Sequence, residues 1–514
     1  MEDLICKAVV GLCGVVLVSL CGLAIFHFVW WRPKRVEMKL RQQGLRGTSY
    51  RFLYGDMVDM NKLRAQSWSK PMALHHAIAQ RVNPFIFNMV QTHGRISLSW
   101  NQRRARLTVA DAKLIRQILE DKHGNFRKPP QNPLIDLLTM GVSNLEGQVW
   151  SNRRKLITPA FHHDKLQGMV PAFLSSCSSL VNKWKELMGS QECYELDVMP
   201  QMQIFSSDVI ARAAFGSSYE QGKRIFELQK EQVVLVIEAA QSLYLPGFSY
   251  LPTKKNKRRY EIDNEIKSLL RDMIEQKQMA IQDGKMDGED LLSLLLQCKD
   301  EAGTELPIED VIEECKLFYF ASQETTANWL TWTLIVLSMH PNWQDKAREE
   351  VLKICGNKTP ALQSLNQLKV VSMILNEVLR LYPPVTTLFR YTLKTTNIGN
   401  ICVPPGVELH LPVILLHHDT DYWGDDADEF NPERFRRGIS NAVAAAKQEM
   451  AFYTFGWGPR YCLGQSFAVM EAKLALAMIL QNFWFELSPS YAHAPHTIIT
   501  LQPQYGAPLL LHRI

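Results

Sequence analysis

An apolar stretch near the amino terminus limits the folds open to this chain more than any other feature. From Ala8 to Trp31 there are 24 residues without Asp, Glu, Lys or Arg. A helix of that length spans about 36 Å, enough to cross a hydrocarbon layer of about 30 Å with some tilt. We predict an uncleaved transmembrane anchor, because the run is too long for a signal peptide and no small-residue cleavage site follows it.

The residues that flank this stretch predict which way it crosses the membrane. Cytosolic flanks of membrane helices are rich in Lys and Arg. A basic segment follows the apolar run, whereas a single Lys precedes it; the basic residues are Arg32, Lys34, Arg35, Lys39 and Arg41. We therefore predict a single-pass protein of the endoplasmic reticulum membrane. Its anchor and stop-transfer segment take up residues 1–35, and its body, residues 36–514, faces the cytosol.

The body reads as one large domain. The chain of 514 residues exceeds the usual size of a single domain, yet no Gly/Ser-rich or Pro-rich linker and no internal repeat divides it. Helical periodicity dominates from about residue 160, and short alternating stretches such as residues 96–100 indicate a small sheet. We predict a mainly α fold with a smaller β region.

Charge and cysteine usage narrow the partners and the compartment. The net charge of +5 is slight and partly local, so we expect no nucleic-acid partner. The ten cysteines show no paired spacing and no C-x-x-C unit, and three of them lie in the apolar leader. This usage is typical of a reducing compartment, and we expect no disulfide framework.

A glycine-rich loop around one cysteine lies near the carboxyl end. Residues 455–464 read Phe-Gly-Trp-Gly-Pro-Arg-Tyr-Cys-Leu-Gly, just before an apolar run that predicts a helix from Phe467 to Leu480. Glycines let the backbone come close to a flat ligand. A cysteine at a helix start is favoured as the thiolate, which is the form that ligates iron. The alternative is a buried, unligated cysteine beside a turn.

The pattern F-G-x-G-x-R-x-C-x-G resembles the haem-binding loop of the cytochrome P-450 monooxygenases. The resemblance implies a single fold of the cytochrome P-450 type behind one N-terminal transmembrane helix. It implies haem b as cofactor, with Cys462 as the axial ligand of the iron and Arg460 at an anionic group on the rim of the haem. The other motifs of this family lie before the cysteine loop in the sequence, in the order that is usual for the family.

Two of these motifs concern the haem propionates. Trp150 and Arg154 are one helical turn apart, so their side chains share a face. By the resemblance, both hold a propionate, and Arg390 matches the usual second propionate-binding arginine. Spacing alone would not assign this role, because many amphipathic helices show a Trp and an Arg one turn apart.

The long central helix is predicted from Pro307 to Met339. Its middle, residues 321–326, reads Ala-Ser-Gln-Glu-Thr-Thr, and buried polar groups need partners or a function. The stretch resembles the A-G-x-E-T-T oxygen-activation motif, which implies that Glu324 and Thr325 deliver protons during O2 activation. The alternative is that the threonines bond back to carbonyls one turn earlier. Ser322 departs from the motif, since the family usually has glycine there, and its effect is open.

One ion-pair motif is predicted to be structural. Glu377 and Arg380 form an E-x-x-R pair, and such pairs are common and weak on surfaces. Flanking Leu and Val residues predict that this pair is buried, and a buried pair needs a further partner. Arg434 supplies it and matches the structural triad of the family.

Three longer stretches look like the plant seventy-two clan of the family: Arg46–Leu53, Leu145–Trp150 and Glu313–Phe320. The resemblance implies a membrane-bound monooxygenase that takes O2 and a lipophilic substrate, a terpenoid such as an iridoid, triterpenoid or diterpenoid. The chain lacks a G-x-G-x-x-G unit, so its electrons should come from NADPH through NADPH–cytochrome P-450 reductase. Arg153, Lys155 and Lys165 are one candidate docking face, and a solvated charge cluster is the other interpretation. The rival functions are a haem-thiolate isomerase or dehydratase that uses no O2, and a non-catalytic haem-binding protein.

Overall fold

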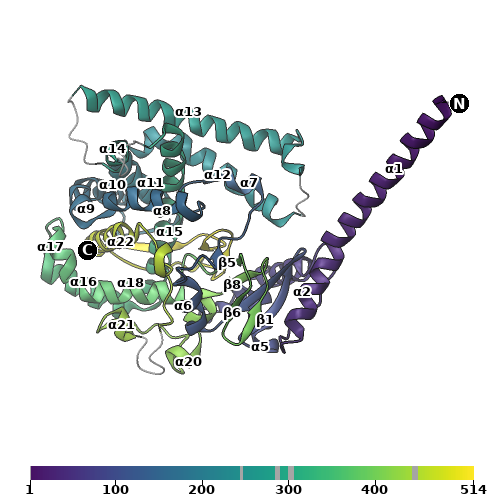
Figure 1. Ribbon diagram of the computed structural model, residues 1–514. Helices are drawn as coiled ribbons and strands as arrows, with labels where there is room; N and C mark the ends of the chain where they lie inside the picture. Colours follow the sequence, from purple (N-terminus) through teal and green to yellow (C-terminus); the bar gives the residue numbers. More distant parts are fainter. Residues whose placement is uncertain (1, 243–246, 284–289, 299–305, 443–449) are drawn as a thin grey trace. The chain divides into compact units, whose positions relative to one another are not determined.

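The computed structural model describes residues 2–242, 247–283, 290–298, 306–442 and 450–514 (Figure 1). The fold is mainly helical with a smaller sheet part, as predicted. The chain divides into two compact units. Unit 1 comprises Met1–Gln66, Asn83–Pro129 and Phe389–Pro412, and unit 2 comprises Ser67–Val82, Pro130–Leu388 and Val413–Ile514. The boundary between an anchor, residues 1–35, and a domain, residues 36–514, stays a prediction.

Unit 1 joins the apolar helix to a five-stranded sheet of order β1-β2-β8-β5-β3. Strands β1 and β2 pair antiparallel, whereas β2 and β8 pair parallel. Its helical elements are α1 (Glu2–Phe26), the π-helical turn η1 (His27–Trp31), α2 (Arg32–Arg41), α3 (Met57–Trp68), α5 (Pro84–His93) and α6 (Ala112–Leu119). Its strands are β1 (Ile96–Asn101), β2 (Arg104–Val109), β3 (Phe126–Arg127), β5 (Leu388–Thr392), β6 (Thr396–Ile398), β7 (Ile401–Val403) and β8 (Glu408–Leu411). Helix α3 and strand β5 each extend slightly past the unit boundary.

The N-terminal helical segment has the length and composition of a membrane span. Residues Ile5–Arg41 include a window of mean hydropathy 2.7 that is wholly exposed to the surroundings. Among the described residues this is the one helix long and apolar enough to cross a membrane. The finding fits the predicted anchor, and the endoplasmic reticulum and the cytosolic orientation remain predictions.

The stretch Arg46–Leu53 fastens the end of this helix to the sheet. In η1 the Val29 carbonyl accepts a hydrogen bond from the hydroxyl of Tyr50, whose oxygen in turn accepts from the Leu53 N–H. In a π-helical turn the backbone pairing is i→i+5 instead of i→i+4. Gly47 lies so close to β1 that an added Cβ would come within 1.9 Å of the Leu98 carbonyl oxygen. This contact explains why a glycine is required at that position.

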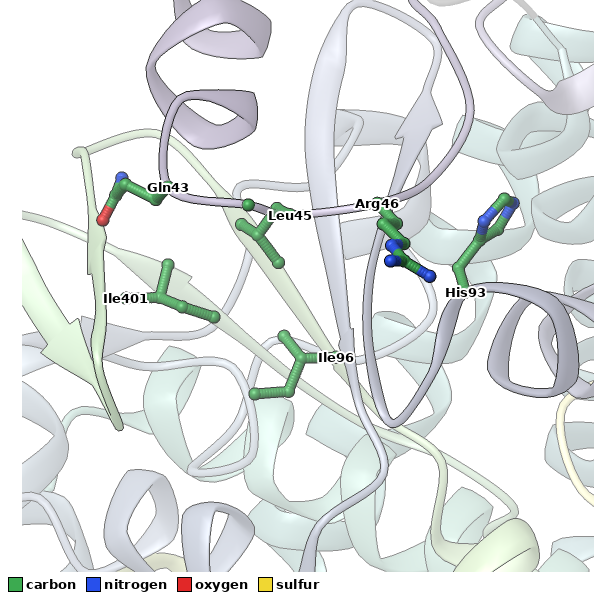
Figure 2. A pocket seen from close by; sticks show the side chains of 7 residues that line it. Gln43, Leu45, Arg46, His93, Ile96 and Ile401 are labelled. Carbon is green, nitrogen blue, oxygen red and sulfur yellow. The ribbon is translucent and has the colours of Figure 1, made fainter.

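A small cavity of about 270 Å³ also lies in unit 1, where the chain leaves α2 (Figure 2). It is lined by Gln43, Gly44, Leu45, Arg46, His93, Ile96 and Ile401. None of the residues that the sequence assigns to haem or oxygen chemistry is among these. The cavity therefore shares no lining residue with the candidate active site.

Unit 2 is built around the long helix α15 (Ile308–Met339), which has Pro307 as its N-cap and ends before Pro341, as predicted. Smaller sheets have the orders β4-β12-β9 and β10-β11. The earlier elements are α4 (Ala79–Val82), α7 (Pro133–Asp136), α8 (Gly147–Ile157), η2 (Thr158–Phe161), α9 (His163–Gly168), α10 (Val170–Met188), β4 (Cys193–Asp197), α11 (Val198–Phe215), α12 (Tyr219–Gln241), η3 (Phe248–Tyr250), α13 (Lys254–Gln282) and α14 (Leu291–Gln297).

After α15, unit 2 continues with the elements that carry the ion-pair motif and the cysteine loop. They are α16 (Pro341–Cys355), α17 (Leu362–Gln367), α18 (Lys369–Leu381), α19 (Val413–His417), α20 (Thr420–Trp423), η4 (Pro432–Phe435), α21 (Ile439–Ala442), η5 (Gly458–Arg460), α22 (Gln465–Asn482), β9 (Phe483–Leu487), β10 (Pro495–Thr497), β11 (Leu501–Pro503) and β12 (Pro508–Arg513). The carboxyl-terminal half of α15, from Thr326 to Ser338, is buried throughout. This half of the helix therefore lies in the core of unit 2, and residues 321–325, which precede it, are half-buried.

Candidate active site

The cysteine loop, residues 455–464, contains the short helical turn η5 and ends where α22 begins. Gly456 and Gly458 have φ angles of 75° and 70°, which side chains rarely tolerate, so glycine is needed at both positions. The Cys462 N–H donates to the Phe455 carbonyl at 2.8 Å, and this bond closes the loop. The thiol is thereby presented just before the amino end of α22, as the sequence predicts.

The side chain of Cys462 is accessible, although protein atoms surround it closely. Burial raises the pKa of this thiol, while the main-chain N–H of Gly464 and the charge of Arg154 act in the opposite direction. The main-chain N–H near the helix start therefore lowers the pKa of the Cys462 thiol, as predicted, but burial raises that pKa by more. A metal cation at the sulfur would supply the missing positive charge. Cys177 and Cys315 are fully buried, with raised pKa values for their thiols, and lack such a setting.

Helix α8 and the cysteine loop are joined by two arginines. Arg460 Nη2 donates to the Leu145 carbonyl at 2.9 Å and to Glu146 Oε2 at 2.7 Å, and its guanidinium lies 4.3 Å from the centre of the Trp150 ring. Arg154 Nη2 donates to the Tyr461 carbonyl at 2.9 Å. The structure thus brings Trp150, Arg154 and Arg460 together beside Cys462. Glu146, which fixes Arg460, is not among the site residues predicted from the sequence.

Arg390 belongs to unit 1, on strand β5, and its Nη1 donates to the carbonyl of Phe389 at 2.8 Å. Its assignment to a propionate stays a prediction.

The polar middle of α15 has a defined set of hydrogen bonds. Thr325 Oγ1 donates to the Ala321 carbonyl at 2.8 Å, which is the local bond anticipated as the alternative. Glu324 accepts from Thr500 at 3.2 Å and from Asn328 at 3.5 Å. Burial raises the pKa of the Glu324 carboxyl, and these two donors oppose the rise. A carboxyl with a raised pKa can hold a proton closer to neutral pH. The delivery of protons by Glu324 and Thr325 stays a prediction.

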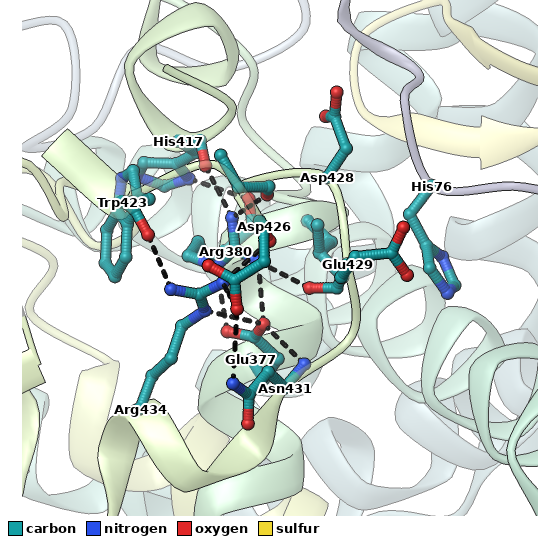
Figure 3. A network of polar contacts seen from close by, with 12 residues as sticks. His76, Glu377, Arg380, His417, Trp423, Asp426, Asp428, Glu429, Asn431 and Arg434 are labelled. Atoms are coloured by element: carbon teal, nitrogen blue, oxygen red, sulfur yellow. Dashed lines mark hydrogen bonds and ion pairs between the residues drawn. The ribbon is translucent and has the colours of Figure 1, made fainter. Parts of the chain in front are cut away.

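The E-x-x-R pair lies inside a buried network (Figure 3). Arg380 donates through Nε and Nη2 to the two oxygens of Glu377 at 2.8 and 2.6 Å. Its other hydrogens reach the carbonyls of His417, Ala427 and Glu429. Arg434 Nε lies 3.6 Å from Glu377 Oε1. The three residues predicted to form a structural triad are therefore in one place.

His417 links this network to the cysteine loop. Its Nδ1 lies 3.0 Å from the carbonyl oxygen of Arg380, which only accepts, so Nδ1 carries the hydrogen. Its Nε2 then accepts from the Tyr453 N–H at 3.2 Å. Burial and nearby positive charges keep the pKa of His417 well below its usual value, so the neutral ring is favoured. The Tyr453 carbonyl accepts from Gly456, which connects the triad to the loop of Cys462.

The prediction that Arg153, Lys155 and Lys165 form a docking face for a reductase is wrong for Arg153. The side chain of Arg153 is buried, with its guanidinium paired to Glu314 at 2.9 Å and to Asp310 at 2.5 Å. A run of basic letters in the sequence could not reveal these partners, which lie far along the chain on α15. Lys155 and Lys165 are exposed.

Comparison with known proteins identifies the class. The family model of cytochrome P450 matches residues 71–505, and the chain belongs to this family. A solved structure titled retinoic acid bound cyanobacterial CYP120A1 has the same fold, with a TM-score of 0.77 at 22% identity over 91% of this chain and 99% of that chain.

More similar relatives place the chain within the family. Cytochrome P450 CYP72A616 of Paris polyphylla is 49% identical over 96% of both chains, and cytochrome P450 CYP72A219 of Panax ginseng is 48% identical over 100% of both. Secologanin synthase 1 of Catharanthus roseus is 44% identical over 97% of this chain and 96% of the relative. The chain is thus a member of the plant seventy-two clan.

Family membership makes the protein an oxidoreductase that carries haem on a cysteine thiolate and takes its electrons from a redox partner. The residues around Cys462 fit such a group. Cys462 is exposed, and a Cβ added at Gly464, two residues further on, would meet no atom within 4 Å. Two guanidinium groups and an indole lie next to the loop.

Proposed function

We propose that this protein is a membrane-anchored monooxygenase that inserts one atom of O2 into a C–H bond of a lipophilic plant terpenoid. The observation that carries the proposal is the cysteine loop with positive-φ glycines, joined to α8 by Arg154 and Arg460. The terpenoid class is supported by the resemblance to the plant clan and by relatives that are secologanin synthases.

Cys462 would hold the haem iron, and Trp150, Arg154, Arg390 and Arg460 would hold the propionates. The haem, when bound, supplies O2 activation and the oxidation of the C–H bond. The N–H of Gly464 stabilises negative charge on the sulfur of Cys462. The structural triad and His417 keep the cysteine loop in place.

Glu324 would act as general acid, because burial favours its protonated form. The Thr325 hydroxyl donates its hydrogen to the Ala321 carbonyl, so its oxygen can accept a hydrogen bond from another group. An oxygen that accepts can orient a proton donor, such as a water or the acid itself. We assign Thr325 this orienting role.

We place the protein in the endoplasmic reticulum membrane with its body in the cytosol. The basic residues after Trp31 support this orientation. NADPH–cytochrome P-450 reductase, in the same membrane, would supply the electrons.

The proposal is tested by incubating microsomes that contain the protein and a plant reductase with terpenoid pools, NADPH and isotopically labelled O2. We expect a mass-spectrometric product that contains one labelled oxygen and that disappears when NADPH or reductase is omitted. A product without label, formed without NADPH, would instead indicate an isomerase or dehydratase. The absence of any product, together with bound haem, would favour a non-catalytic binder.

A further inference from the structure

The hydrogen bonds around Glu324 lead to a residue outside α15. Asn328, one turn further along, donates from Nδ2 to the main-chain oxygen of Glu324 at 2.9 Å. A carbonyl oxygen only accepts, so this contact fixes which end of the Asn328 amide carries hydrogen. The same Nδ2 lies 2.9 Å from Thr500 Oγ1, which must therefore accept. The single hydrogen of the Thr500 hydroxyl is left for Glu324 Oε2, 3.2 Å away.

Thr500 reaches Glu324 from a well-held turn. It lies between β10 and β11 and is 4% exposed, and Asn328 is 1% exposed. The next residue, Leu501, accepts from Trp332 Nε1 of α15 at 3.1 Å and donates its N–H to the Pro384 carbonyl at 2.9 Å. The hydroxyl therefore comes from a turn that is bonded to α15 on one side and to the chain after α18 on the other.

We propose that Thr500 is a positioning residue that orients the Glu324 carboxyl and stabilises the carboxylate left when Glu324 has given up its proton. The inference rests on the proposed function, in which Glu324 is the acid. A donor aimed at Oε2 leaves Oε1 to carry the proton that is passed on. Hydrogen bonds to a charged group are stronger than those to a neutral one, so the Thr500 bond strengthens on ionisation.

Other groups near Glu324 cannot replace this donor. The positive charge of Lys230 on α12 also favours the carboxylate, but it acts by charge and not by a hydrogen bond. Asn328 Nδ2 is 3.5 Å from Oε2, at the limit of a hydrogen bond. Among the described residues, Thr500 is thus the nearer of the two side-chain donors to this carboxyl.

The test compares Thr500→Val, which keeps the shape and removes the donor, with Thr500→Ser, which keeps the donor. Infrared difference spectra of the ferric protein across a pH series report ionisation of the carboxyl, and Glu324→Gln identifies its band. We expect Thr500→Val to raise the pKa of Glu324 by about one unit or more, because a hydrogen bond to the charged form is lost. Thr500→Ser should match the parent protein. An unshifted titration in Thr500→Val would overturn the proposal.

A matched control removes a buried threonine hydroxyl from α15, the helix that carries Glu324. Thr331 is buried and donates to the Ala327 carbonyl, so Thr331→Val should leave the Glu324 band unchanged. An equal shift in this control would overturn the proposal, because any lost threonine would then have the same effect. If Thr500→Val does not fold, Thr500→Ala removes the same donor and takes its place in every comparison.

Turnover supplies the second readout. With reductase and NADPH, Thr500→Val should form severalfold less product per NADPH and release more peroxide, whereas Thr500→Ser should restore coupling. If the parent protein forms no oxygenated product, the proposed function fails, while the infrared titration still decides the role of Thr500. If Glu324→Gln is uncoupled but Thr500→Val behaves like the parent in both readouts, the role of Thr500 alone is overturned.

Discussion

Two carboxylates in unit 2 have very different surroundings. Glu377 is fully buried, accepts from Arg380 through both oxygens and from the Asn431 N–H at 3.0 Å, and lies near a second guanidinium. Glu324 has neutral hydrogen-bond donors, Thr500 and Asn328, and a raised pKa. A carboxylate enclosed by guanidinium groups is a fixed charge that holds structure together. A carboxyl with neutral donors can hold a proton and release it.

The largest effect should follow from breaking the guanidinium network. Arg380→Ala leaves Glu377 buried without its main partner, a change that typically costs about 3–5 kcal/mol. We expect little folded protein and no haem-carbonyl band in the reduced state. The control is Arg258→Ala, which removes an exposed pair with Glu231 and should cost about 1 kcal/mol or less. Normal yield and spectrum in Arg380→Ala would contradict the structural role of the triad.

A smaller effect, confined to chemistry, is expected at the other carboxyl. Glu324→Gln keeps an acceptor for Thr500 but has no acidic proton, so the fold and the haem-carbonyl band should be retained. Product formed per NADPH should fall by about tenfold or more, since positioned general acids commonly contribute at least that much. Glu275→Gln on the exposed face of α13 is the matched control. An unchanged yield in Glu324→Gln would remove Glu324 from the proton supply.

Features formed within one short stretch of sequence could be predicted, whereas contacts between remote residues could not. The loop of Cys462 and the polar middle of α15 are each contained in one short stretch, so their residues and order suffice for a prediction. The partners Thr500 and Glu146 lie 176 and 314 positions away from Glu324 and Arg460. No local pattern encodes such contacts, which depend on how α15 and α8 pack. The wrong prediction for Arg153 has the same cause, because its partner Glu314 is remote in sequence.

A third buried carboxyl extends the comparison to pH. Glu471 on α22 accepts from Ser206, its Oε2 has no hydrogen-bond partner among the described residues, and burial raises its pKa to about 8. The folded state therefore holds a proton that the unfolded chain releases above about pH 4.5. The free energy of unfolding should then fall by about a few kcal/mol as the pH rises from about 4.5 to about 8.

Glu471→Gln tests this dependence. The variant cannot ionise at this position, so thermal loss of the haem band should change less between pH 6 and pH 8.5 than in the parent protein. Glu349→Gln, an exposed change on α16, should keep the parent dependence. A parallel pH dependence in Glu471→Gln and the parent would show that Glu471 does not ionise in this range.

The smallest effect concerns Ser322, in the same polar stretch as Glu324. A motif that usually carries glycine here uses its missing side chain, because glycine costs a helix about 1 kcal/mol relative to alanine. Serine adds a Cβ and a hydroxyl, and Thr325 already supplies a hydroxyl one turn away. We expect the steric effect to dominate, so Ser322→Gly should keep the haem-carbonyl band and modestly raise product per NADPH. Thr325→Ala should consume NADPH and release peroxide. If Ser322→Gly lowers the yield per NADPH, the serine hydroxyl belongs to the proton supply with Glu324, and the steric interpretation is wrong.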